Sequence, residues 1–395
     1  MIDIADRQAR RAVAVSFAIQ GATFASIAAR LPAIKDDYGF SDFGILAMLA
    51  AVAAGSVVGS LIAGLTAARW GSAVTLRIAM AGVSVAAFVA MLGGDKVSFV
   101  ILATCYGSFV GSVDASQNMQ GVGVQERYGR SLMTSFYAIY SLAAALGAGY
   151  ASLSLALDWS LPTSLAVVMV AGLLTNLVWM RTLLPPSADP LEIETDTSTK
   201  LPWGPVLLVA LPTFAMWVAD SATNVWSGIY LEDGLGAAVE VAPLAILAYQ
   251  LLLFVVRLFG DRLVGRYGAA RLVRACGWTA VAGLVLVVAA PTVPVVIVGF
   301  AVLGAGLSLI PPLAFVAAAH LDPGNADRAV ARVNISNYLG YIVAAFGIAV
   351  VAEDVSHRAM FVVPLALAVL IPMLARQYTP RVSAAGSAAP APAGS

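Results

Sequence analysis

Long apolar stretches separated by short polar turns run through almost the whole chain. Averaged over about 19 residues, a window that suits a membrane-crossing helix, the hydropathy predicts twelve spans. They cover residues 11–30, 42–66, 74–94, 97–122, 132–156, 160–182, 204–231, 241–263, 271–290, 293–318, 330–352 and 358–376. The sequence therefore predicts an all-α membrane protein with twelve transmembrane helices.

One polar segment separates the first six spans from the last six. Residues 185–202 carry four acidic side chains and one lysine, which is typical of a solvated linker; a regulatory loop is the alternative. The last residues are rich in Ala, Pro, Gly and Ser and predict disorder. We expect an N-terminal six-helix bundle (1–184), a cytoplasmic linker (185–202), a C-terminal six-helix bundle (203–378) and a disordered cytoplasmic tail (379–395).

The two sets of six spans repeat one another at a constant offset of 197 residues. The offset holds in two pairs of equivalent loops, which indicates duplication into two parallel halves, an arrangement that secondary transporters use. The matched pairs are Asp36 and Asp233, Gly39 and Gly236, Arg69 and Arg266, Gly71 and Gly268, and Arg77 and Arg274.

Composition and charge agree with a membrane protein. Hydrophobic residues make up 60% of the chain and charged residues 11%, whereas soluble domains have roughly 45–50% and 25%. The net charge of zero gives no reason to expect a nucleic-acid partner, and two cysteines and two histidines are too few for a usual metal site. We expect no cofactor.

The positive residues predict the orientation in the membrane. With a cytoplasmic N-terminus, 18 of the 22 Lys and Arg residues fall on the cytoplasmic side, as the positive-inside rule requires. We therefore expect a multi-pass protein of the cytoplasmic (inner) membrane with both termini in the cytoplasm.

Polar side chains inside the spans are the candidate functional residues, because lipid cannot satisfy them. Asp114, Gln117 and Asn118 share one face of the fourth span, at helical spacing. A carboxyl group in such a place can carry a proton, since burial disfavours its charged form. Asp114 is therefore either a proton-coupling or substrate site, or an aspartate that a neighbouring helix satisfies.

The other half offers a second aspartate, Asp220 in the seventh span. Arg257, inside the eighth span, either reaches to the membrane surface or pairs with an acid in the centre. Of the aromatic residues we assign Trp226, Tyr230 and Tyr338 to the interfacial belt. The remaining candidates for the pathway are Gln20, Trp217, Asn224 and Gln250.

The loop after the second span resembles the signature loop of the major facilitator superfamily. It reads Gly64-Leu-Thr-Ala-Ala68-Arg69-Trp-Gly71, with Ala68 where that family has an acid. The second-half copy, Arg266-Tyr-Gly268, also lacks the acid, although Asp261 precedes it by about one turn. The resemblance implies that spans one, four, seven and ten line a central cavity and that these loops help to hold one conformational state. Glu126 and Arg130 are either part of the same inner gate or a solvated loop.

Within that superfamily, the run from Arg30 to Ile34 followed by Tyr38-Gly39-Phe40-Ser41 is similar to a permease-like bacterial subgroup. That subgroup includes sugar permease relatives and a rhizopine-associated membrane protein. The fifth span lacks the Gly-Pro pair of many drug exporters, and the fourth lacks their intramembrane arginine. These two absences count against export as the function without excluding it.

We expect a secondary active transporter rather than an enzyme, moving a small polar organic solute by alternating access with proton coupling. Export is favoured, and uptake of a sugar-like or cyclitol-like solute is the alternative. A non-transporting sensor or assembly partner is the alternative of another class. The expected partners are the solute, protons and the lipid bilayer, with the protein as a monomer.

Overall fold

The computed structural model of the protein describes residues 2–28, 30–185, 203–238, 241, 243–344 and 357–379. Within these ranges the secondary structure is helical, as expected for an all-α membrane protein. The N-terminal half contains α1 (Ile4–Ala28), α2 (Leu31–Tyr38), α3 (Asp42–Trp70), α4 (Ser72–Ala90), α5 (Lys96–Tyr128), α6 (Met133–Ala156), α7 (Leu161–Trp179) and the 3-10 turn η1 (Met180–Thr182).

The C-terminal half continues the same pattern. Its helices are α8 (Trp203–Ile229), α9 (Pro243–Tyr267), α10 (Ala269–Ala289), α11 (Val293–Leu307), α12 (Ile310–Ala319), α13 (Ala326–Ile342), α15 (Val362–Ala368) and α16 (Leu370–Leu374). Short turns lie between or after them: η3 (Tyr230–Gly234), η4 (Pro323–Asn325), η6 (His357–Phe361) and η7 (Ala375–Tyr378).

Eleven of the twelve expected spans are present as helices long and apolar enough to cross a membrane, among the described residues. The remaining one, expected at 330–352, begins as α13, and its residues from 345 onward lie outside the described ranges. Nearly all of the expected linker and tail, 186–202 and 380–395, also lies outside them. The short helix α2 was not predicted, because its eight residues include Lys35, Asp36 and Asp37 and give no hydropathy signal.

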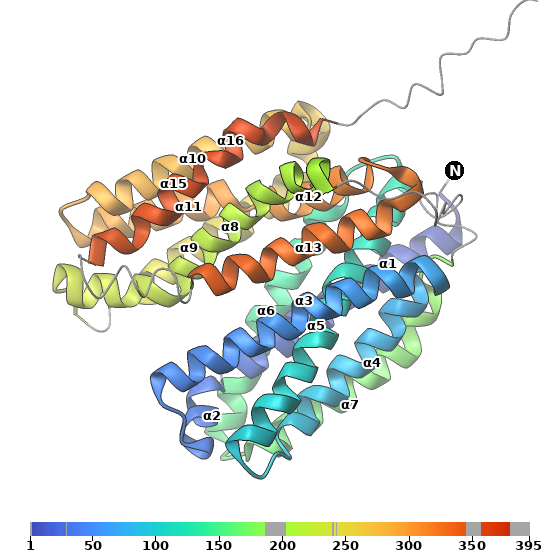
Figure 1. Cartoon of the computed structure of the whole chain (residues 1–395), viewed down its shortest axis with the longest axis horizontal. Coiled ribbons are helices and arrows are strands. Elements are labelled where there is room, and N and C mark those ends of the chain that lie inside the picture. Colours follow the sequence, from blue (N-terminus) through green and yellow to red (C-terminus); the bar gives the residue numbers. More distant parts are fainter. Residues whose placement is uncertain are drawn as a thin grey trace, which may run out of the picture.

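The two sets of six spans meet near the N-terminus and diverge toward the opposite end, where α2 lies (Figure 1). Contacts between the halves are made chiefly by α3 with α13 and by α6 with α9. Each of these pairs joins helices that are far apart in sequence. We call the end that holds the N-terminus, where the halves are in contact, the closed end.

The loop glycines have the same backbone conformation at matched positions of the two halves. Gly71 has φ 83° and ψ 151°, and Gly268, 197 residues later, has φ 79° and ψ 154°. Gly39 and Gly236, the other matched pair, have φ 62° and 66°. Residues other than glycine rarely adopt such positive φ values, so both halves need glycine at the same turns.

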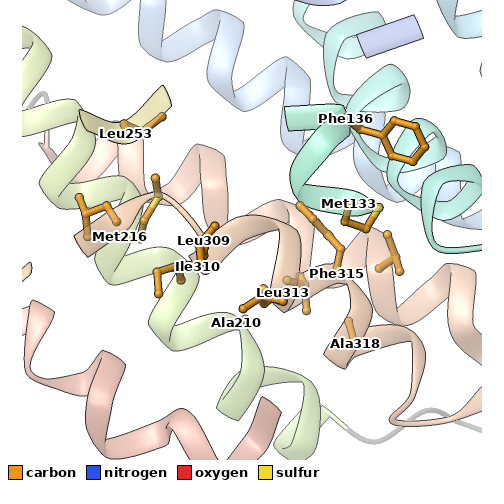
Figure 2. Packing of buried hydrophobic residues seen from close by; sticks show 14 of the residues in the cluster. Met133, Phe136, Ala210, Met216, Leu253, Leu309, Ile310, Leu313, Phe315 and Ala318 are labelled. Carbon is orange, nitrogen blue, oxygen red and sulfur yellow. The ribbon is translucent and has the colours of Figure 1, made fainter. Parts of the chain in front are cut away.

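An apolar seam joins the halves at the closed end. The tenth span breaks between Leu307 and Ile310, just before Pro311 and Pro312, because proline cannot continue the hydrogen bonding of a helix. The break sets α12 against α6, and Met133 and Phe315 belong to one buried cluster that includes both halves (Figure 2). Burial of these side chains excludes water from the closed end.

Asp261 of α9 forms a polar latch beside this seam. Its carboxylate accepts hydrogen bonds from the backbone N–H groups of Thr134 (3.2 Å) and Ser135 (3.1 Å) at the start of α6. The hydroxyls of Ser131 (2.8 Å), Thr134 (2.6 Å) and Ser135 donate to the same carboxylate. A helix N-terminus leaves N–H groups unpaired and favours negative charge, so the latch ties one half to the helix end of the other.

A second polar contact crosses the halves close to the latch. Glu126 Oε1 at the end of α5 lies 3.0 Å from His320 Nε2 at the end of α12. Arg130, which was considered for the same network, lies over the ring of its neighbour Tyr128. Arg69 and Arg266 likewise lie over the adjacent Trp70 and Tyr267.

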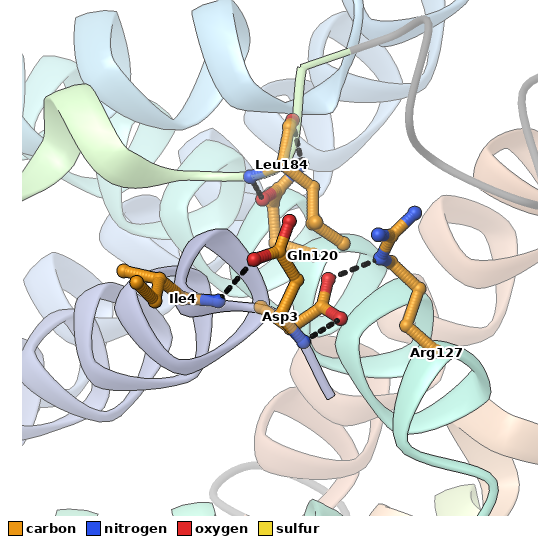
Figure 3. Close-up of polar contacts among 6 residues, drawn as sticks. Asp3, Ile4, Gln120, Arg127 and Leu184 are labelled. Carbon is orange, nitrogen blue, oxygen red and sulfur yellow. Dashed lines mark hydrogen bonds and ion pairs between the residues drawn. The ribbon is translucent and has the colours of Figure 1, made fainter. Parts of the chain in front are cut away.

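The amino-terminal segment is tied to its own half rather than to the opposite one. Arg127 Nε donates to Asp6 Oδ1 at 2.5 Å, so α1 begins at Ile4, well before the expected residue 11 (Figure 3). Gln120 exchanges hydrogen bonds with the backbone of Leu184, accepting from its N–H at 2.9 Å and donating to its oxygen at 3.1 Å (Figure 3). These bonds fix both ends of the N-terminal half.

Helices α3 and α5 pack at close range through small residues. A Cβ added at Gly59 would overlap the backbone of Ser108, and one added at Gly111 would overlap that of Ser56. Ser112 Oγ donates to the Gly59 oxygen (2.9 Å) and Ser60 Oγ to the Gly111 oxygen (3.2 Å). Without a hydrophobic drive between helices in lipid, such contact and hydrogen bonding hold a bundle together.

We expect Gly59→Ala to lower the free energy of unfolding by about 1–3 kcal/mol, because the methyl group forces α3 away from α5. Gly149→Ala is the matched control, since a Cβ there meets no atom within 4 Å. Unfolding of the purified protein in detergent measures both. Equal stability of the two variants would contradict the close-packing account.

We expect Asp261→Asn to shift the protein toward conformations open at the N-terminal end. An amide presents N–H groups to the donors of α6, and loss of charged hydrogen bonds costs about 1.5–3 kcal/mol. Distances between spin labels at the exposed residues Arg130 and Arg266, in a background with both cysteines replaced by alanine, measure the shift.

Asp95→Asn is the control for the latch. Asp95 accepts from the N–H groups of Val97 (2.8 Å) and Ser98 (3.0 Å) at the start of α5, so it caps a helix in the same manner, within its own half. Its replacement should leave the label distances unchanged. A distance distribution that is the same in Asp261→Asn and the unmodified protein would contradict the latch.

Candidate functional site

Asp114 lies at the centre of the molecule, between the two halves. Gln20 Nε2 from α1 donates to Asp114 Oδ1, and the Tyr338 hydroxyl from α13 donates to Oδ2. Gln117 Nε2 donates in turn to Gln20 Oε1, and Ser16 Oγ donates to Gln117 Oε1 at 3.4 Å. One carboxylate therefore accepts hydrogen bonds from both halves.

Asn118 extends the cluster toward α6. Its Nδ2 donates to the backbone oxygen of Asp114 at 2.7 Å, and its Oδ1 accepts from the Tyr137 hydroxyl at 3.2 Å. The predicted face of α5 thus brings Asp114, Gln117 and Asn118 together with Gln20. Gln117 and Asn118 are each 2% exposed, so lipid does not reach them.

Asp220 lies in a second cluster, which belongs to the C-terminal half alone. The Tyr249 hydroxyl donates to Asp220 Oδ1, and Asn224 Nδ2 donates to Oδ2 at 3.2 Å. Gln250 Nε2 donates to Asn224 Oδ1 at 3.4 Å. Unlike Asp114, Asp220 has donors from only one half.

Arg257 is buried at the centre, which rules out the alternative that it reaches to the membrane surface. Its side chain is 7% exposed, and its charge acts on Asp220. Its Nε donates to the Ser308 oxygen (3.2 Å), and one terminal nitrogen donates to Ser141 Oγ of α6 (2.9 Å). Its guanidinium also lies 5.4 Å from the centre of the Tyr137 ring, in the opposite half. Asp220 therefore has a buried countercharge, whereas neutral groups satisfy Asp114.

Helix α13 contributes a polar face that the sequence analysis underestimated. Asn334, Asn337, Tyr338 and Tyr341 recur at helical spacing. Asn334 Nδ2 donates to Ser60 Oγ of α3 at 2.9 Å, and Asn337 Nδ2 donates to Asn334 Oδ1 at 2.9 Å. The assignment of Tyr338 to the membrane interface was wrong: it is 8% exposed and bound to Asp114. The two asparagines on the same face as Tyr338 were the available signal.

The aromatic residues near this face also differ from expectation. Tyr230 is fully buried and donates to the Val287 oxygen at 2.9 Å, so it too is not interfacial. Trp217 packs against Tyr341, with ring centres 5.4 Å apart. Cys105 is exposed, whereas Cys276 is buried.

The chemistry of the centre follows from these contacts. Each of the four carboxylate oxygens of Asp114 and Asp220 accepts a hydrogen bond from an uncharged protein donor. In the described part of the chain no three His, Cys, Asp or Glu side chains come together in a way that could hold a metal ion. The arrangement can bind a proton and a polar solute at the junction of two halves.

Comparisons with known proteins agree with this architecture. The sequence model of the Major Facilitator Superfamily matches residues 209–393. An uncharacterized transporter of Sinorhizobium fredii is 28% identical over 377 residues, which cover 92% of this chain and 97% of the relative. An uncharacterized MFS-type transporter of Yersinia pestis is 24% identical and covers 86% of this chain and 88% of its own.

Among solved structures, the MFS transporter FucP in its outward conformation superposes with a TM-score of 0.78 at 14% identity. It covers 94% of this chain and 98% of its own. This likeness shows the fold, which is the twelve-helix fold that the hydropathy predicted. The chain is a multi-pass membrane protein that is similar in sequence and in fold to transporters of the major facilitator superfamily.

Proposed function

We propose that the protein is a proton-coupled secondary transporter of a small polar organic solute, with Asp114 as the proton-binding group. The hydrogen bonds of Asp114 carry this proposal, because they come from both halves at once. A charged carboxylate accepts at both oxygens, whereas a protonated one must donate from one of them. A proton on Asp114 therefore alters a bond between the halves, which a proton on Asp220 does not.

The energy of that bond is sufficient to bias alternating access. Hydrogen bonds to charged groups contribute about 1.5–3 kcal/mol, which changes an equilibrium by about 10- to 150-fold. The latch of Asp261 and the contact between Glu126 and His320 hold the N-terminal end closed. Similarity to FucP in its outward conformation supports assigning this state to the outward-facing form.

We place both termini in the cytoplasm of a cell with the transporter in its inner membrane, as a monomer. The distribution of positive residues supports this orientation. In this arrangement the Asp261 latch, the Glu126 contact and the loop motif of Gly64, Arg69, Gly71, Arg266 and Gly268 belong to the cytoplasmic gate. The family has an acidic residue at the position of Ala68. We assign its gating role to Asp261, which bonds to the start of α6.

Direction follows from whether proton and solute bind together or in turn. We retain export, by exchange of solute for protons, as the first candidate. Uptake by symport is the second, and one observation favours it. Both oxygens of Asp114 are occupied by protein donors, so a solute has no need to displace the proton in order to bind.

We expect Asp114→Asn to abolish acceleration of solute flux by a pH gradient while retaining exchange of solute for solute. The amide keeps the size of the side chain but cannot bind and release a proton. Reconstituted liposomes with and without an imposed gradient measure both rates. Gradient-driven flux that survives this substitution would exclude Asp114 as the coupling group.

Asp220→Asn separates the coupling role from general damage to the cavity. It leaves the charge of Arg257 without its nearby acid, so we expect slower flux of every kind with the response to the gradient retained. If Asp220→Asn lost the response to the gradient and Asp114→Asn kept it, the coupling group would be Asp220 and our proposal would be wrong.

The sign of the imposed gradient decides direction without knowledge of how the protein inserts into liposomes. Symport predicts accumulation of solute inside vesicles that are acidic outside, and exchange predicts accumulation inside vesicles that are acidic inside. Export as the physiological direction requires the second result. Accumulation with the exterior acidic would replace it with uptake.

A further inference from the structure

Two tyrosine hydroxyls at the centre have no hydrogen-bond partner among the described residues. They belong to Tyr106 of α5 and Tyr140 of α6, both half-buried and within electrostatic reach of Asp114 and of each other. The other polar groups around Asp114 are bonded to one another, as with Gln20, Asn118 and Tyr338. The free hydrogen-bonding capacity at the centre therefore includes the hydroxyls of Tyr106 and Tyr140, alongside the buried and unbonded atoms Asn337 Oδ1, Trp217 Nε1 and Ser221 Oγ.

Their place in the fold puts them on the open side of Asp114. Tyr106 precedes Asp114 by eight residues on α5, or about 12 Å along the helix axis, toward the end where the halves diverge. Tyr140 lies about one turn beyond Tyr137, away from the latch at the start of α6. A solute entering between the halves meets these hydroxyls before it reaches the carboxylate.

The charges around them favour an uncharged solute. Asp220 has Arg257 as its countercharge, and all four carboxylate oxygens already accept from the protein. With a proton on Asp114, the charges of the two aspartates and Arg257 sum to zero. A cation would therefore add a net positive charge to a balanced centre, whereas an alcohol adds none and can both donate to and accept from a phenol hydroxyl.

We propose that Tyr106 and Tyr140 bind the transported solute and that this solute is an uncharged, hydroxyl-rich compound, a sugar or cyclitol in chemical class. The proposal rests on the function proposed above and names its substrate site. The apolar faces of the two rings pack against the carbon–hydrogen surface of such a compound, while their hydroxyls bond to its alcohol groups. Asp114 stays free to hold the proton.

The test is binding of chemically defined probes to the purified full-length protein. The neutral panel contains inositol isomers, aldohexoses and pentoses; choline and benzoate serve as charged probes. Thermal stabilisation at increasing probe concentration gives the affinity. We expect at least one neutral probe to bind, and Tyr106→Phe and Tyr140→Phe each to weaken it by about three- to tenfold.

Tyr150→Phe is the matched control, on the same helix as Tyr140. The Tyr150 hydroxyl donates to the Ser164 oxygen at 2.8 Å, so its removal should lower the unfolding temperature and leave the affinity unchanged. Tyr106→Phe and Tyr140→Phe should weaken binding and leave the unfolding temperature unchanged, because neither hydroxyl has a hydrogen-bond partner among the residues that the structure describes. This opposite pattern separates a substrate contact from a structural role.

Three results would overturn the proposal: charged probes bind while no neutral probe does, no probe of either class binds, or both phenylalanine variants keep full affinity. Failure of the coupling role is distinguishable, because binding is measured at equilibrium with no gradient. A neutral probe that binds through these tyrosines, in a protein whose flux ignores pH, would keep this site and remove Asp114 from coupling.

Discussion

The structure depends on how a carboxylate is satisfied in the middle of a membrane protein. Asp114 cannot be left without donors there, since burial of an unpaired charge is costly. Its donors are Gln20 of one half and Tyr338 of the other. The hydrogen bonds that satisfy the buried carboxylate thus also link the two halves. In our proposal a proton on Asp114 changes these hydrogen bonds and so changes the link. Solute recognition on the free hydroxyls of Tyr106 and Tyr140 leaves that link intact.

The duplicated chain uses equivalent positions in different ways. Gly64 and Asp261 are related by the 197-residue offset. At Gly64 an added Cβ would lie 2.9 Å from Ala331 Cβ, so α3 and α13 close by direct contact. At Asp261 the same position caps the start of α6 with five hydrogen bonds. Divergence at one site of a repeat has given one gate contact that is steric and another that is electrostatic.

Much of the fold could be predicted because its signals are local. Hydropathy fixes spans of about 20 residues, and the glycines at 39, 71, 236 and 268 mark turns that only a positive φ allows. The face of Asp114, Gln117 and Asn118 followed from helical spacing. Tyr338 could not be predicted as the partner of Asp114 in this way, since it reaches the site through packing between the halves. For Arg257 the sequence left two alternatives open, and its burial decides between them. Hydropathy also started α1 too late and ended α5 too early, because it left out Asp6 and Arg127, which satisfy each other's charge.

The central claim is that a proton on Asp114 loosens the contact between the halves. The most direct measurement is the pH dependence of distances between spin labels placed on the two halves at the diverging end, without solute. The account predicts that acidification shifts the population toward a narrower opening in the unmodified protein, and that Asp114→Asn holds one population at every pH. A shift of equal size in both proteins would contradict it.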